Sequence, residues 1–322
     1  MCTMNTRTPL PTSYEIVVCI GPQHLEIAKT TIRYLYRLFD IQRIIVIINP
    51  RYFQQFTALK AEIPILALVD ENTLFDSFNF HSISQYMLQR LGDDKRSGWY
   101  FQQFLKMEAH KLVNTAYYLI WDADTVPLAP INFFKDQHSV WIHPGEEHHQ
   151  PYFDTLYRLL GIPRIATNSF ISEHLMVSKK TMRLLIESFQ KKSLVQPWPL
   201  LVLESIDEKQ LPFSGFSEYE TYGNFALVHF PDQVTVRKNT MEKIKSYRHG
   251  SQLFGNQPNE ESLYVLKEMG FHYVTFEVWD QVDKKTIRKN EKIAWLFNFL
   301  HRNNFPPFLT NKILQKVTKQ LA

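Results

Sequence analysis

The chain has 322 residues, of which 44% are hydrophobic and 14% aromatic, so it can bury a sizeable core as one large domain or two. Ten glycines and two cysteines exclude collagen-like, disulfide-framed and zinc-ribbon proteins, because Cys2 and Cys19 have no metal-ligand spacing. Residues 284–322 carry nine Lys or Arg against Glu291 alone, giving +8 there and −4 for residues 1–283. A basic tail on a slightly acidic body favours surface targeting over nucleic-acid binding.

The N-terminal segment and the cysteine content predict where the protein works. Residues 1–13 are polar, and the apolar run 16–20 is too short for a signal peptide or a membrane span. No Asn-x-Ser/Thr sequon occurs. We therefore expect a cytosolic protein in a reducing compartment.

The first seventy residues alternate between apolar runs and helical periodicity. Residues 15–20, 43–48 and 63–69 are predicted strands, and residues 24–39 and 51–61 are predicted helices. This alternation predicts a parallel sheet with helices on both faces. Gly21 follows the first strand, and Asp70 and Glu71 follow the third. Each acid is a candidate for accepting hydrogen bonds from ribose hydroxyls or for capping a helix.

Two further helices, at 82–91 and 99–112, precede an apolar strand at 117–121. Asp122 and Asp124 follow that strand, and Pro127 is expected to prevent ladder pairing nearby. Carboxylates at the carboxyl end of a central strand lie where open α/β sheets bind ligands. They suit Mg²⁺ or Mn²⁺ bound together with substrate phosphates. The alternative is a solvated turn.

The second half of the chain contains two further clusters of polar residues. Glu173 and His174 lie between hydrophobic residues, so they are either paired or facing a cleft, where the carboxylate would recognise an acceptor or act as a general base. Residues 213–225 hold two acids and two tyrosines, and Ser217 with Glu220 matches a capping box. Helices are predicted at 152–160 and 179–189, and strands at 139–143, before 236 and at 272–279. The histidines of the loop 143–149 match no zinc motif and favour a solvated loop.

Four blocks in fixed order carry a resemblance: GWYFQQFLK at 98–106, YLIWDADTVP at 118–127, SFISEH at 169–174 and FSEYETYG at 216–223. They resemble a family of bacterial and viral proteins, described largely as a domain of unknown function, that is similar to GT-A nucleotide-sugar transferases. The resemblance covers about residues 13–280. It implies a GT-A-like, Rossmann-like sheet, mostly parallel and flanked by helices, in a catalytic domain at 13–283. A basic, helical extension follows at 284–322.

The resemblance also implies roles for individual residues. The donor would contact Gly21, Asp70, Gln103, Lys106, Asp122 and Arg248, although a lysine beside aromatic residues is also typical of a snorkelling surface group. Asp122 and Asp124 would hold Mn²⁺ or Mg²⁺, with His249 as a third ligand and His229 as its competitor. Glu218 is the first candidate for a base in an inverting reaction, and Glu173 the second. His174 would contact the acceptor, with Tyr219 and Tyr222 as platforms for sugar stacking.

These features together predict a metal-dependent glycosyltransferase that uses a nucleotide sugar, with UDP-sugar as the expected donor. The acceptor would be a hydroxyl of a glycan or glycolipid, such as a surface polysaccharide or lipopolysaccharide. A nucleotidyl- or phosphotransferase would show the same carboxylates, and a non-catalytic nucleotide-sugar-binding module is the other alternative. The basic, aromatic tail either contacts the inner face of an anionic membrane or packs as a helical pair on the body.

Overall fold

The computed structural model describes residues 13–237, 244–280 and 283–318. The chain divides into two compact units that each combine distant segments. The first unit comprises Met1–Gly21, Asp40–Asp122 and Asn132–Met241, and the second comprises Pro22–Phe39, Ala123–Ile131 and Glu242–Ala322. The predicted boundary at residue 283, between a catalytic domain and a C-terminal extension, stays a prediction.

The first unit is built on a five-stranded sheet with strand order β3-β2-β1-β4-β7. The pairs β3–β2, β2–β1 and β1–β4 are parallel, and β7 runs antiparallel to β4, with Trp121 opposite His174. Every residue of β1 and β2 is buried, as expected for continuous apolar runs in a covered sheet. The strands are β1 (Tyr14–Ile20), β2 (Ile44–Ile48), β3 (Leu66–Asp70), β4 (Tyr117–Trp121) and β7 (His174–Ser178).

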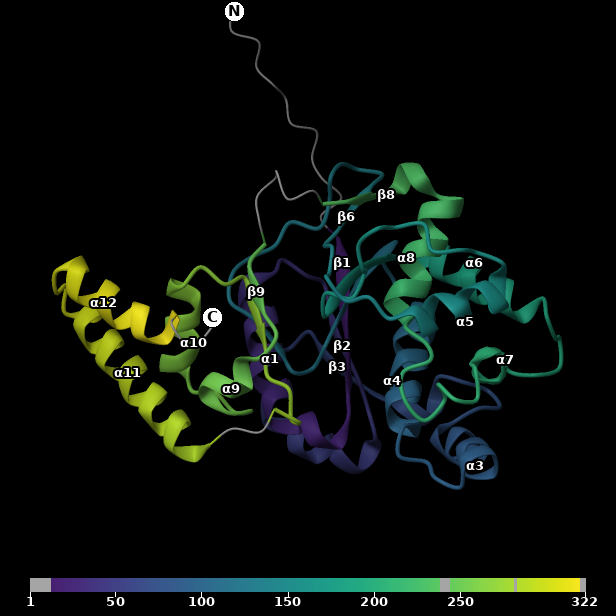
Figure 1. The fold of residues 1–322 in the computed structure, drawn as a ribbon, viewed down its shortest axis with the longest axis horizontal. Coiled ribbons are helices and arrows are strands. Elements are labelled where there is room, and N and C mark those ends of the chain that lie inside the picture. Colours follow the sequence, from purple (N-terminus) through teal and green to yellow (C-terminus); the bar gives the residue numbers. More distant parts are fainter. Residues whose placement is uncertain (1–12, 238–243, 281–282, 319–322) are drawn as a thin grey trace, which may run out of the picture. The chain divides into compact units, whose positions relative to one another are not determined.

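Seven α-helices accompany this sheet among the described residues of the first unit, and α4, α6 and α8 lie together on one side of the central strands (Figure 1). A 3-10 helix at Pro50–Phe56 runs directly into α2, so the predicted helix at 51–61 is only partly α-helical. A separate pair of parallel strands, β6 (Val140–Ile142) and β8 (Val234–Val236), belongs to the same unit. The helices are α2 (Thr57–Glu62), α3 (Phe80–Leu91), α4 (Ser97–Glu108), α5 (Gln150–Leu160), α6 (Lys179–Gln190), α7 (Trp198–Ser205) and α8 (Glu218–His229).

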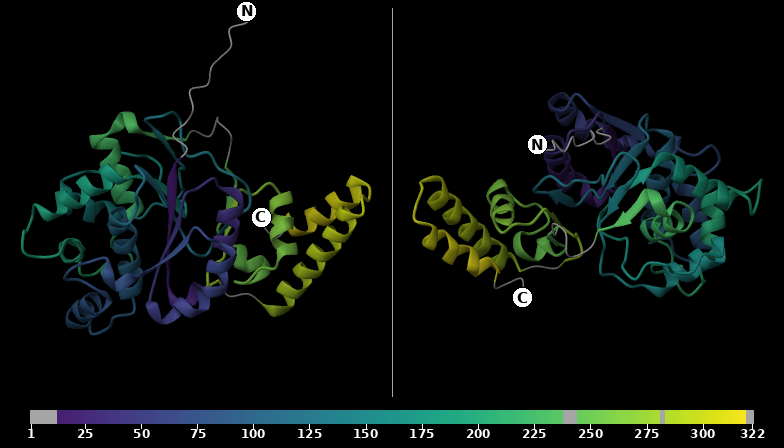
Figure 2. Two further views of the ribbon diagram at one scale, coloured as in Figure 1. Left: turned by 180° about the vertical axis from the view of Figure 1, so that it is seen from behind. Right: turned by 90° about the horizontal axis from the view of Figure 1, so that it is seen from above.

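The second unit packs helices around a small sheet with order β5-β10-β9. Its apolar core includes Ile27, Val126, Phe254, Leu266 and Phe297. The elements are α1 (Leu25–Leu38), β5 (Thr125–Pro127), β9 (Ser246–Tyr247), α9 (Gly250–Phe254), α10 (Glu260–Glu268), β10 (Tyr273–Thr275), α11 (Lys284–Arg302) and α12 (Pro307–Thr318). Both views of Figure 2 show α11 and α12 side by side.

The expectation that Pro127 prevents ladder pairing was wrong. The segment Thr125–Pro127 forms β5, which pairs antiparallel with β10 and places Pro127 opposite Tyr273. Proline is tolerated there because β5 is an edge strand and Pro127 is its last residue, so the missing N–H interrupts no ladder. The predicted strand at 272–279 is correspondingly short, since only Tyr273–Thr275 pairs as a strand.

The mixed α/β fold with a mostly parallel central sheet, predicted from the alternation of apolar runs and helices, is confirmed. Among the described residues, every helix is too short or too polar to cross a membrane.

Candidate functional site

The first unit brings polar side chains to the carboxyl end of β4. Because β1, β2, β3 and β4 are parallel, their carboxyl ends share one edge of the sheet. Asp122 follows β4 directly, and its backbone N–H donates to the carbonyl of Glu173 at 2.9 Å. Glu173 has φ +59°, a left-handed conformation that is rare for residues other than glycine, asparagine or aspartate. This turn before β7 therefore fixes the backbone that carries Asp122.

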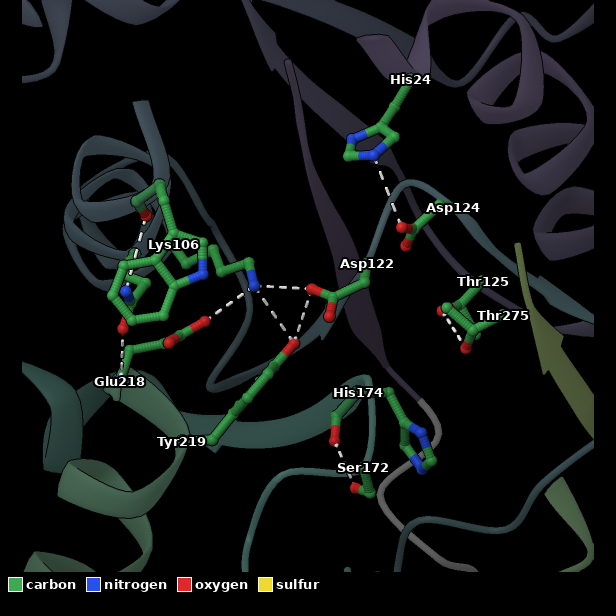
Figure 3. Close-up of polar contacts among 12 residues, drawn as sticks. His24, Lys106, Asp122, Asp124, Thr125, Ser172, His174, Glu218, Tyr219 and Thr275 are labelled. Carbon is green, nitrogen blue, oxygen red and sulfur yellow. Dashed lines mark hydrogen bonds and ion pairs between the residues drawn. The ribbon is translucent and has the colours of Figure 1, made fainter. Parts of the chain in front are cut away.

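Lys106 of α4 lies at the centre of the site (Figure 3). Its ammonium Nζ is 2.6 Å from Oδ1 of Asp122 and 2.7 Å from Oε1 of Glu218. The Tyr219 hydroxyl donates to the same Oδ1 of Asp122 at 2.8 Å. We call Lys106, Asp122, Glu218 and Tyr219 the lysine cluster. The alternative that Lys106 is a snorkelling surface residue is wrong, because its side chain is only 11% exposed.

Burial and charge act in opposite directions on the ionisable groups of the lysine cluster. Burial lowers the pKa of Lys106, but the charges of Asp122 and Glu218 together outweigh burial and hold that pKa well above its usual value. Burial raises the pKa of Glu218, and Lys106 opposes this effect only in part. Burial and the charge of Asp122 also raise the pKa of Tyr219. The cluster thus holds a permanent ammonium ion beside a carboxyl group of increased proton affinity.

The start of α8 positions Glu218 and Tyr219. Ser217 caps the helix by accepting from the backbone N–H of Glu220, which is one half of the predicted capping box. Gln103 of α4 accepts from the backbone N–H of Glu218 through Oε1, at 3.1 Å. The carboxylate of Glu220 instead accepts from the Ser169 hydroxyl at 2.6 Å. Glu220 therefore has a structural role, and the Gln103 side chain positions the backbone of Glu218.

The carboxyl ends of the neighbouring strands carry the other predicted donor residues. Asp70 accepts from the backbone N–H of Asn72 at 2.9 Å. It therefore caps a short helix, which is one of the two roles that the sequence indicated for this acid. Glu71 accepts from the Asn49 side chain at 2.8 Å, and burial raises its pKa. Gly21 directly follows β1. Burial raises the pKa of the Cys19 thiol, which lies next to the last residue of β1.

Three other predicted acceptor or catalytic residues lie close to β4 and β7. His174 is buried and its ring stacks on that of Trp121, with centroids 4.9 Å apart; burial lowers its pKa to about 3. The Tyr222 hydroxyl accepts from the backbone N–H of Ser178 at 2.8 Å, and its ring is buried in the core. The Glu173 side chain is half-buried. The rings of His174 and Tyr222 thus pack within the protein.

The second unit holds Asp124 and the predicted basic residues. Oδ2 of Asp124 is 3.5 Å from Nε2 of His24, a residue that no sequence motif indicates. The Asp124 carbonyl accepts from the backbone N–H of Phe276 at 2.8 Å. His249 pairs with Asp280 at 3.4 Å, and Arg248 pairs with Glu277 at 3.2 Å. Within this unit, His24 is therefore the histidine next to Asp124.

Carboxylate oxygens such as those of Asp122 are suitable ligands for a hard divalent cation. Both contacts of the Asp122 carboxylate use Oδ1, so Oδ2 remains for a further ligand, and Asp124 offers a second carboxylate two residues later. Among the described residues, no group of three or more His, Cys, Asp or Glu side chains is arranged to enclose a metal ion. Mg²⁺ typically binds through one or two carboxylates and completes its shell with water and phosphates. His229, the competing histidine ligand, is exposed on α8 beside Phe225.

The sequence did not reveal the pairing of Asp124 with His24 or the bond from Tyr219 to Asp122. His24 lies a hundred positions before its partner and is preceded by the sequence Gly-Pro-Gln, which carries no ligand motif. The sequence indicates the ring of Tyr219 as a platform for sugar stacking, whereas its hydroxyl makes the contact with Asp122. His24 lies close to the end of β1, whereas Tyr219 lies in the first turn of α8, so the sequence indicated neither contact.

Fold and site define an α/β protein with a charged cluster at the carboxyl end of its parallel strands. The chain belongs to a family of unknown function (DUF6492), whose model matches residues 23–282. A search of curated proteins finds no match to the chain.

Several solved structures are similar to the chain at low sequence identity. The apo form of mouse xyloside xylosyltransferase 1 is 15% identical, with 74% of this chain and 88% of that chain covered and a TM-score of 0.40. The apo structure of the bifunctional glycosyltransferase WbbM is 12% identical, with 84% of this chain and 46% of that chain covered and a TM-score of 0.43. The galactosyltransferase LgtC in complex with donor and acceptor sugar analogues is 9% identical, with 87% of this chain and 95% of that chain covered and a TM-score of 0.45.

Proposed function

We propose that this protein is a metal-dependent glycosyltransferase that moves a sugar from a nucleoside-diphosphate sugar, with UDP-sugar as the expected donor, to a hydroxyl of a glycan or glycolipid. One observation carries the proposal: all four sequence blocks that resemble the GT-A-like family converge on the lysine cluster. Three blocks supply the cluster itself: Lys106 comes from block 98–106, Asp122 from block 118–127, and Glu218 and Tyr219 from block 216–223. Block 169–174 supplies the Glu173 carbonyl, which accepts from the Asp122 backbone N–H.

The lysine cluster provides the charges that a diphosphate leaving group requires. Lys106 remains protonated because two carboxylates stabilise it, so it offers a fixed positive charge beside Asp122. Lys106 and Tyr219 together hold Oδ1 of Asp122 and thereby orient the remaining oxygen, Oδ2. Asp122 and Asp124 would hold Mn²⁺ or Mg²⁺, which when bound neutralises charge that develops on the diphosphate.

The transfer itself breaks one bond and forms one. The bond between the anomeric carbon and the diphosphate oxygen breaks, and its electron pair stays with the diphosphate. The acceptor hydroxyl oxygen bonds to the anomeric carbon and loses its proton. In an inverting reaction Glu218 takes this proton, which its raised pKa favours. Glu173 is the second candidate base, and a retaining reaction needs neither.

A panel of nucleotide sugars with Mn²⁺ and candidate acceptors tests the proposal by the release of free nucleotide. We expect release that a chelator abolishes and that Asp124→Ala reduces at least about a hundredfold, the order of loss seen when one electrostatic group is removed from an active site. Asp93→Ala, at an exposed carboxylate of the first unit, is the matched control and should retain activity. Nucleotide attached to the acceptor would identify a nucleotidyltransferase, and chelator-insensitive release would exclude the metal.

A further inference from the structure

Helix α11 packs one of its sides against the rest of the second unit. Its buried side contains Asn290, Ala294, Phe297 and Asn298. Asn290 donates to the carbonyl of Leu253 at 2.9 Å, and Asn298 donates to the carbonyl of Glu261 at 3.1 Å. Side-chain amides that bond to buried carbonyls fix the rotation of the helix about its axis. The sequence left two alternatives for the tail, contact with a membrane or packing on the body. This side of α11 packs on the body.

The opposite side of α11 is exposed and follows helical spacing from end to end. Exposed residues recur three or four positions apart, which places them on one face of the helix. We call this the α11 outer face, and it consists of Lys285, Arg288, Lys289, Lys292, Trp295, Leu296, Phe299 and Arg302.

Large apolar side chains form the second half of the α11 outer face. Trp295 is 61% exposed, Leu296 42% and Phe299 48%. The rings of Trp295 and Phe299 stack with centroids 5.7 Å apart and an interplanar angle of 16°. Phe305, just after the helix, is also exposed and lies 6.4 Å from Phe299 between ring centroids. A contiguous exposed patch of aromatic residues is uncommon on a monomeric protein and indicates a contact surface.

Cations form the first half of the α11 outer face and also follow the aromatic patch. Lys285, Arg288, Lys289 and Lys292 precede the patch, and Arg302 follows it. The one acid of the helix, Glu291, lies three positions after Arg288 and four before Trp295, at the edge of this face, and is half-buried. A surface that covers this face must therefore be both apolar and anionic.

We propose that the α11 outer face is a docking surface for an anionic phospholipid membrane, with Trp295, Leu296 and Phe299 inserted among the headgroups and the basic residues in contact with lipid phosphates. A helix with one apolar and basic face is the type that lies in the plane of a membrane interface. A second copy of the chain fits less well, since pairing two such faces would bring their cations together.

Co-sedimentation with phosphatidylcholine vesicles, with and without phosphatidylglycerol, tests this proposal on the full chain. We expect binding to the phosphatidylglycerol vesicles that weakens with added salt, because salt screens surface charge. Arg288→Gln, Lys289→Gln and Lys292→Gln together should lower the partition coefficient on the order of a hundredfold, since each cation contributes about fivefold near an anionic bilayer. Trp295→Ala with Phe299→Ala should also reduce binding.

Two controls separate loss of docking from loss of folding. Tyr157→Ala removes an equally exposed ring, 62% exposed, from α5 of the first unit and should leave vesicle binding unchanged. All variants should keep the thermal midpoint of the wild type, because the replaced side chains are exposed. The proposal is overturned if the wild type ignores phosphatidylglycerol, or if Trp295→Ala with Phe299→Ala only dissociates a dimer without changing vesicle binding. Because no sugar nucleotide is used, the result is independent of the proposed enzyme activity.

Discussion

At the scale of single residues, Lys106 joins two acidic residues that lie far apart in the chain, Asp122 and Glu218. The sequence left two alternatives, a ligand-facing lysine and a surface lysine, because helical periodicity shows which face a residue occupies but not what lies opposite. The structure places Glu218, 112 positions later, at 2.7 Å from the ammonium. No local pattern encodes a contact of that separation. The position of Asp122 at the end of a buried strand was predictable because the apolar strand and the acid are adjacent in the chain.

Replacing Lys106 should destabilise the fold itself. Lys106→Met leaves the carboxylates of Asp122 and Glu218 without their common cation, and removal of one partner from a buried ion pair typically costs about 3 kcal/mol or more. Lys95→Met is the matched control, because its pair with Asp93 at 3.0 Å is exposed and contributes less than about 1 kcal/mol. Urea denaturation of both variants measures the difference, and equal losses would contradict the burial of the cluster.

The raised pKa of Glu218 predicts a pH dependence of stability. Burial raises this pKa above the ordinary 4.5, so the native chain keeps a proton that the unfolded chain has already lost. The free energy of unfolding should therefore fall as the pH rises from 4.5 through the native pKa, by about 1.4 kcal/mol for each pH unit between the unfolded and the native pKa. The difference in stability between the wild type and Glu218→Gln, measured by urea denaturation across this range, should show that fall. A difference that rises with pH would mean that Lys106 dominates and lowers the pKa.

At the scale of elements, strands and helices with a clear hydrophobic pattern were predictable, and strand pairing was not. The strands β1, β2 and β4 are continuous apolar runs, and α1, α4 and α6 show helical periodicity, so their positions follow from the sequence. The three-residue strands β6, β8 and β10 coincide with predicted strands, whereas the three-residue β5, which ends in Pro127, shows no periodicity and was not predicted. The antiparallel β7 was missed because its apolar residues show burial but not direction. Pairing partners are a tertiary property, which local sequence does not specify.

Gly223 determines how closely α8 approaches the core. A Cβ on Gly223 would overlap the ring of Phe170, whereas a Cβ on Gly98 of α4 would have the ring of Phe80 as its nearest neighbour, at 4.0 Å. Gly223→Ala should therefore destabilise the protein by about 1–3 kcal/mol through overpacking. Gly98→Ala, the matched helical control, should stabilise it by about 0.5 kcal/mol. Thermal denaturation compares the two, and a neutral Gly223→Ala would show that α8 packs more loosely.

At the scale of the whole molecule, the two carboxylates of the Asp-x-Asp sequence belong to different units. Asp122 ends a segment of the first unit, and Asp124 lies in the second. Each has its own partner, Lys106 for Asp122 and His24 for Asp124. The sequence predicted the Asp-x-Asp pair from two adjacent positions, but it could not show that the chain passes from one compact unit to the other between them.

Isothermal titration of UDP in the presence of Mn²⁺ tests the central claim most directly, namely that the lysine cluster and the Asp-x-Asp sequence bind a metal and a nucleoside diphosphate together. We predict that chelation weakens UDP binding at least about tenfold, which corresponds to about 1.4 kcal/mol. Asp122→Asn and Asp124→Asn should each cause a similar loss even with Mn²⁺ present, while Asp93→Asn at the exposed surface should not. UDP affinity that is unchanged by chelation and by both site variants would contradict the account.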